Sequence, residues 1–139
     1  MAVPENVVKT SDFDFFSQEE AEVFDNTVGI RRRHIAPDNM CASDMCQAAA
    51  EKLLEELGWE RDSIDVLLFE SVTGDYRTPP TSCILQDRLA LSENCFCMDI
   101  PMGCCGCMYA ITVAGNLLTT GNVKRALLLI GDTALRMGS

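Results

Sequence analysis

Three apolar runs constrain the fold of this chain more than any other feature. They lie at 66–72, 95–100 and 125–131. The first run is apolar almost throughout, and a strand that is apolar on both faces needs cover on both faces, as in a parallel sheet between helices. Segments with helical patterns precede or follow these runs, at 44–57, 80–90 and 104–119. Because alternating strands and helices indicate right-handed crossovers, the sequence predicts an α/β fold with a parallel sheet.

The helical segments also suggest where helices start and how deeply they lie. Ser43 and Asp44 offer an N-cap to 44–57, and Gly58 offers a C-terminal stop. Segment 104–119 is apolar on nearly every side. We therefore expect that helix to be buried on most sides.

Composition excludes several classes of protein. The chain has 139 residues and a net charge of −10, which argues against a nucleic-acid partner because phosphate binding needs a basic field. No run is long enough to span a membrane, and no signal peptide precedes the eight cysteines. We therefore expect one domain in the cytoplasm, with reduced thiols and no membrane partner.

The cysteine spacing and the single histidine do not indicate a metal site. The groups Cys95-x-Cys97 and Cys104-Cys105-x-Cys107 lack the spacing of structural zinc ligands, so no metal is expected. His34 follows three arginines, which disfavour its charged form. A structural hydrogen bond is the expected role of this side chain.

A possible nucleophile lies where the second apolar run meets the last helix. The segment passes from Asp99 through a turn of small residues to Cys104, next to the helix start. Unpaired N–H groups at a helix N-terminus favour a thiolate, while Gly103 and Gly106 allow a tight turn and close approach. The alternative is an inert, buried cysteine. In an open α/β sheet this position would place Cys104 at the bottom of a cleft, at the carboxyl end of a strand.

Four stretches carry a resemblance to a known family. They are Val28–Ala36, the pattern Ser71-x-Thr73 with Pro79 and Gln86, the motif of Asp99, Cys104, Gly106 and Tyr109, and the turn from Gly121 through Lys124 and Ala126 to Gly131. Together they resemble β-ketoacyl-acyl-carrier-protein synthase III of the thiolase-like superfamily, from Pro4 onward. The resemblance implies a layered α-β-α fold with a mixed, mostly parallel sheet. Residues 1–139 would be the amino-terminal half of this duplicated fold.

The resemblance also implies a reaction. Cys104 would accept an acyl group from acyl-coenzyme A, and malonyl-acyl carrier protein would then condense with it in fatty acid biosynthesis, within a homodimer. Backbone near the nucleophile, at Cys104 and Gly106, would help to stabilise the oxyanion. No cofactor is expected beyond the coenzyme A thioester, which is a substrate.

Several positions depart from the family pattern. Val23 and Thr27 stand where a Trp and an Arg grip the adenine of coenzyme A, so the residues that bind coenzyme A are unknown. Thr78 replaces a Phe that reaches the partner subunit's acyl pocket, and with Val72 it is a candidate acyl-pocket or dimer contact. The family's catalytic His and Asn have no counterpart in the chain, so we expect a fragment that is inactive alone.

Two other classes of function stay open from the sequence. One is a different condensing enzyme of the superfamily, which makes a quinolone, polyketide or hydroxymethylglutaryl product. The other is a non-catalytic thiolase-like scaffold in which Cys104 is merely structural.

Overall fold

Three parallel strands form the centre of the molecule in a computed structural model that describes residues 1–134. Strand β3 (Val66–Glu70) lies between β4 (Phe96–Ile100) and β5 (Ala126–Ile130). The strands are in phase, because Glu70 of β3 is opposite Ile100 of β4 and Ile130 of β5. All five residues of β3 are buried, as expected for a strand covered on both faces.

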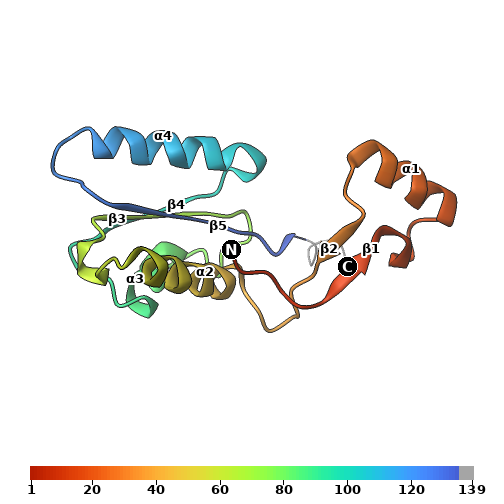
Figure 1. The fold of residues 1–139 in the computed structure, drawn as a ribbon, viewed down its shortest axis with the longest axis horizontal. Coiled ribbons are helices and arrows are strands. Elements are labelled where there is room, and N and C mark those ends of the chain that lie inside the picture. Colours follow the sequence, from red (N-terminus) through yellow and green to blue (C-terminus); the bar gives the residue numbers. More distant parts are fainter. Residues whose placement is uncertain (135–139) are drawn as a thin grey trace.

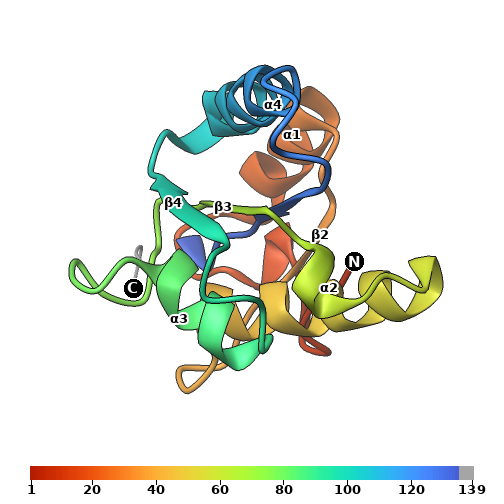
Figure 2. The same ribbon diagram turned by 90° about the vertical axis from the view of Figure 1, so that its left-hand side faces the viewer.

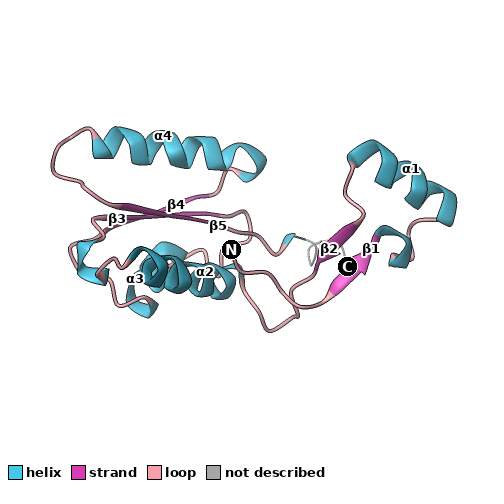
Figure 3. Ribbon diagram, in the orientation of Figure 1, coloured by secondary structure: helices cyan, strands magenta, loops and turns pink. Residues whose placement is uncertain are grey.

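Helices cover both faces of this sheet and complete three layers (Figure 1). Helices α2 (Ala42–Leu57) and α3 (Thr81–Arg88) lie on one face, and α4 (Gly106–Leu118) lies on the other (Figures 2 and 3). The parallel α/β fold predicted from the sequence is therefore confirmed.

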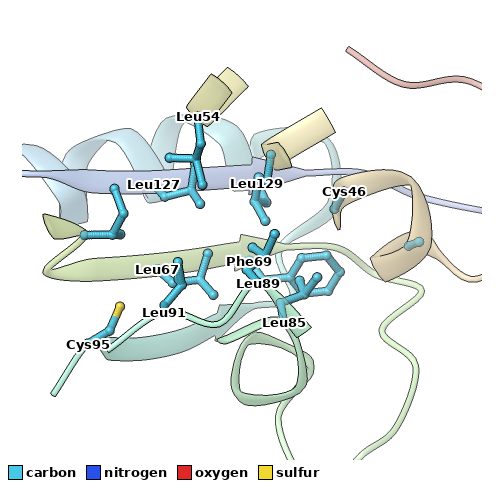
Figure 4. Close-up of a cluster of buried hydrophobic side chains, with 13 residues drawn as sticks. Cys46, Leu54, Leu67, Phe69, Leu85, Leu89, Leu91, Cys95, Leu127 and Leu129 are labelled. Carbon is cyan, nitrogen blue, oxygen red and sulfur yellow. The ribbon is translucent and has the colours of Figure 1, made fainter. Parts of the chain in front are cut away.

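The larger hydrophobic core lies between the sheet and the pair α2 and α3 (Figure 4). Alternation along β3 sends Leu67 and Phe69 into this core, whereas Val66 and Leu68 contribute to a smaller cluster beneath α4. Glu70 follows Val66 and Leu68 as the next residue on the same side of β3. Its position therefore directs a carboxyl group towards the α4 layer.

Helix α2 begins two residues earlier than the sequence predicts. Its N-cap is Cys41, and the Asp44 carboxylate, at the third helical position, accepts a hydrogen bond of 2.7 Å from the Cys41 N–H. The expected cap at Ser43 and Asp44 was wrong because Asp44 caps from inside the helix. Gly58 ends the helix in a left-handed conformation (φ 60°), as predicted.

The last helix also differs from expectation. Residues Gly103–Cys105 form a 3-10 turn, and α4 proper begins at Gly106. Of its residues only Gly106 and Ala110 are buried, whereas Met108 is 65% exposed. The expectation that this helix is buried on most sides is wrong for residues 1–134, because the sheet covers only one side of it.

A smaller N-terminal unit lies beyond the carboxyl ends of the sheet strands (Figure 1). Strands β1 (Val7–Lys9) and β2 (Arg32–His34) form an antiparallel pair in a separate sheet, joined through a 3-10 turn (Thr10–Asp12) and helix α1 (Gln18–Val28). The Nδ1 atom of His34 is hydrogen-bonded to the Pro4 carbonyl. The structural role predicted for this histidine is therefore confirmed.

Candidate functional site

The candidate nucleophile lies at the carboxyl edge of the sheet, in the turn Gly103–Cys105 that joins β4 to α4. Gly103 has a φ of 62°, a left-handed conformation that favours glycine. Cys104 and Cys105 are both exposed. The sequence placed Cys104 at the bottom of a cleft, and this is wrong for the part of the chain described, where no element covers the turn.

The two adjacent thiols differ in what they contact. The Cys105 thiol is directed back into the turn, 3.3 Å from the Met102 carbonyl oxygen. Cys104 precedes the first helical residue, Gly106, by two positions. No acidic side chain occupies the first turn of α4, so the partial positive charge of this 13-residue helix is left for an anion at the turn.

Gly106 is required by the close approach of Glu70. A Cβ atom built on Gly106 would lie 2.5 Å from the Glu70 Cδ and would overlap its Oε1. The backbone of Gly106 itself is ordinary helix (φ −58°). Glycine is therefore needed here for space, as the sequence suggested, but the group that approaches is a buried carboxyl.

Glu70 is the site residue that sequence reasoning missed. Its side chain is only 2% exposed, and its Oε1 has no hydrogen-bond partner in residues 1–134. Burial raises the pKa of this carboxyl, and the nearby Asp132 carboxylate raises it further. The signal available in the sequence was a single acidic residue inside an apolar strand.

Asp132 connects the loops that follow β3 and β5. Its Oδ1 accepts hydrogen bonds from the Ser71 hydroxyl (2.9 Å), the Val72 N–H (2.8 Å) and both the N–H and the hydroxyl of Thr73 (3.2 and 3.0 Å). The Ser71-x-Thr73 motif therefore supplies donors to an acid sixty residues away. This contact holds the two loops together beside the nucleophile turn.

The structure places the two proposed acyl-pocket residues differently. Val72 lies beside the nucleophile turn, since a Cβ built on Gly103 would lie 3.4 Å from its Cγ1. Val72 also lines a cavity of about 470 Å³ together with Thr73, Asp75 and Cys41. Thr78 is exposed in the loop before α3 and does not line this cavity.

Asp99 is the first residue of the motif that identifies Cys104, and its carboxylate stabilises the start of α3. Its two carboxylate oxygens accept the N–H groups of Thr81 (2.7 Å) and Ser82 (2.8 Å), the first two residues of α3. These donors would otherwise be unsatisfied at a helix N-terminus. Asp99 therefore holds α3 against β4.

The two positions that depart from the coenzyme A pattern lie together on α1. Val23 is 61% exposed, and its carbonyl accepts a hydrogen bond of 2.8 Å from the Thr27 hydroxyl. Both residues line a hollow of about 610 Å³ with Phe16, Phe24 and Val28. No cationic side chain lines this hollow among residues 1–134.

Residues 1–134 contain neither a cluster of metal ligands nor a membrane-spanning helix. Within residues 1–134 no group of three or more His, Cys, Asp or Glu side chains is arranged to hold a metal ion. In the same range no helix combines the length and apolar character needed to cross a bilayer. All eight cysteines are free thiols.

Known proteins match the chain over nearly its whole length. β-Ketoacyl-[acyl-carrier-protein] synthase III of Xanthomonas oryzae pv. oryzae is 33% identical over 97% of the chain. The crystal structure of a 3-oxoacyl-(acyl-carrier protein) synthase from Burkholderia xenovorans LB400 superimposes with a TM-score of 0.92, at 40% identity over 98% of the chain. A tetronic acid condensing enzyme superimposes with a TM-score of 0.84, at 25% identity over 97% of the chain. No protein-family model matches.

The matches cover only part of each relative. The chain spans 41% of the length of the Xanthomonas synthase, 39% of the Burkholderia structure and 42% of the tetronic acid enzyme. The resemblance stated from sequence motifs and the layered α/β fold that it implied are both confirmed.

Proposed function

We propose that Cys104 is the nucleophile of a condensing acyltransferase, because the chain is related over 97% of its length to β-ketoacyl-acyl-carrier-protein synthase III. The single observation that carries the proposal is the place of Cys104. Cys104 is exposed at the carboxyl edge of a parallel sheet, two positions before a helix N-terminus that no side chain of residues 1–134 caps. This is the electrostatic setting in which a thiolate is favoured.

The first half-reaction transfers an acyl group to Cys104. The thiolate attacks the carbonyl carbon of acyl-coenzyme A, the new S–C bond forms, and the S–C bond to coenzyme A breaks. Coenzyme A leaves as a thiolate and takes up a proton. Backbone N–H groups in the turn Gly103–Cys105 would stabilise the oxyanion formed in between. The Gly106 N–H, which the sequence also suggested for this role, already donates to the Gly103 carbonyl oxygen.

The second half-reaction uses malonyl-acyl carrier protein as the partner. Loss of carbon dioxide gives a carbanion that attacks the Cys104 thioester, and the thiolate leaves from a 3-oxoacyl product. This covalent intermediate gives ping-pong kinetics. A homodimer in the cytoplasm and a role in fatty acid biosynthesis belong to the same proposal.

Mass spectrometry after incubation of the full-length protein with acyl-coenzyme A tests the proposal. We expect one acyl adduct, localised to Cys104 by fragmentation and absent from the C104A variant. C105A is the matched control, because it removes the adjacent exposed thiol and keeps Cys104. An adduct that persists in C104A, or no adduct on any thiol, contradicts the proposal and favours a scaffold.

The size of Thr78 bears on the choice of acyl group. A small side chain where relatives carry Phe leaves room for a longer or branched primer, so we expect T78F to slow acylation by octanoyl-coenzyme A about tenfold relative to acetyl-coenzyme A. The same mass spectrometric assay gives both rates. If the unsubstituted protein accepts acetyl groups alone, this assignment of Thr78 is wrong.

A second candidate is a condensing enzyme of another pathway. The likeness to a tetronic acid condensing enzyme favours it, because the same fold and a large part of the chain are shared. Acylation of Cys104 is common to both candidates. The product formed with malonyl-acyl carrier protein distinguishes them.

A further inference from the structure

A buried acid lies directly beneath the helix end that carries the candidate nucleophile. Glu70 is the last residue of β3, and alternation along the strand turns its side chain towards α4. Its Cδ and Cγ fill the space that a Cβ on Gly106 would need, at 2.5 Å. Gly106 is the first residue of α4, and Cys104 is two residues before it.

Within residues 1–134, one oxygen of the Glu70 carboxyl group has no hydrogen-bond partner, and the group takes part in no ion pair. Its Oε1 is inaccessible to solvent and has no hydrogen bond in residues 1–134. The two ion pairs of the same range, Lys52–Glu56 and Arg88–Asp44, do not include Glu70. An unpaired buried carboxylate is costly, and its neutral form is favoured instead.

Asp132 is the ionisable group whose charge acts on Glu70 in residues 1–134. Asp132, beyond β5, disfavours a second negative charge, and burial adds to this effect, so the pKa of Glu70 is raised. On the α4 side the nearest ionisable side chains along the chain are the thiols of Cys104, Cys105 and Cys107. Asp99 of β4 and Asp75 of the loop after β3 are engaged elsewhere, with the N-terminus of α3 and with Ser43.

We propose that Glu70 is a second ionisable group of the nucleophile site, a positioning residue that controls the reactivity of Cys104 through its own charge. In the neutral form it leaves the positive end of α4 to the Cys104 thiolate. In the ionised form its negative charge competes for the same helix end and disfavours the thiolate. This inference rests on the proposed role of Cys104 as nucleophile, but the test of the inference does not require acyl transfer.

The test is the rate of Cys104 alkylation by iodoacetamide between pH 5 and pH 9, measured by mass spectrometry in the protein, E70Q and E70M. Both variants remove the charge, and E70Q keeps the shape of the acid. As the pH falls and Glu70 takes up its proton, we expect the three rates to converge. At higher pH we expect Cys104 to react roughly threefold to tenfold more slowly in the unsubstituted protein than in either variant.

Two measurements complete the design. E93Q is the matched control, since Glu93 is exposed before β4, at the opposite end of the sheet, and its profile should follow that of the unsubstituted protein. The ¹³C resonance of the Glu70 carboxyl should titrate above the usual range for glutamate, in step with the divergence of the rates.

The outcomes separate this inference from its alternatives. Rates that differ by one constant factor at every pH indicate a packing effect and overturn the inference, as do identical profiles in all variants. A pH-dependent divergence without any acyl adduct on Cys104 supports the inference and contradicts the proposed function. An acyl adduct on Cys104 together with identical profiles in all variants supports the proposed function and overturns the inference.

Discussion

At the scale of single residues, buried and exposed thiols differ in their chemistry. Burial raises the pKa of Cys46 to about 11, and burial together with the neighbouring Cys95 thiol raises the pKa of Cys97 to about 12. Cys83, Cys104 and Cys105 are exposed. Since only the thiolate is nucleophilic, composition alone could not say which of the eight would react.

This difference predicts a pattern of alkylation. At pH 8 we expect iodoacetamide to modify the exposed thiols first and Cys46 roughly a hundredfold more slowly, because each pKa unit lowers the thiolate fraction tenfold. A time course followed by peptide mass spectrometry measures the rates. In urea all eight should react alike. Equal rates for Cys46 and Cys83 in the folded protein would contradict the prediction.

The contact between Gly106 and Glu70 gives a second prediction at this scale. G106A should lower the free energy of unfolding by about 2 kcal/mol, because the new methyl overlaps the Glu70 side chain. Combining it with E70A should recover part of the loss, since the space is then free. Urea denaturation measures both.

A glycine elsewhere on the same helix is the control for that substitution. Gly115 of α4 has no atom near the position of a Cβ, so G115A should raise the free energy of unfolding by about 0.5 to 1 kcal/mol. If G106A and G115A have the same effect, the contact with Glu70 is not what requires glycine at 106.

At the scale of elements, the start of α3 depends on a residue from a neighbouring strand. Asp99 of β4 accepts the Thr81 and Ser82 N–H groups at 2.7 and 2.8 Å. We expect D99N to lower the free energy of unfolding by about 1 to 2 kcal/mol, because the amide loses the charge and one acceptor. D87N, an exposed change on the same helix, should have little effect. Equal stability of the two variants in urea would refute this role.

The elements also show what periodicity does and does not determine. The apolar runs and the helical spacing of apolar residues located β3, β4, β5 and the three helices beside them to within a few residues. It did not reveal that Cys104 precedes α4 in a 3-10 turn, or that Asp44 caps α2 from within. Both details depend on hydrogen bonds between particular atoms, which hydrophobic patterns do not encode.

At the scale of the whole molecule, stability is distributed unevenly. Strand β3 is buried along its length and paired on both sides, whereas β1 and β2 are three residues each and pair only with one another. We expect amide hydrogen exchange to be slowest in β3 and fastest in the N-terminal unit, because an isolated two-stranded pair is only marginally stable. Exchange in β1 as slow as in β3, measured by NMR or mass spectrometry, would contradict this.

The sequence by itself determined the parallel α/β layering and the position of the candidate nucleophile. Apolar runs must be covered, and a short motif specifies a strand, a turn and a helix start along one stretch of chain. Only the tertiary structure decided what surrounds that stretch. Glu70 and Asp132 come from the ends of two other strands, and the task of Asp99 is set by α3. Burial, close approach and mutual repulsion of charges are properties of residues far apart in sequence, so they exist only once the strands lie side by side.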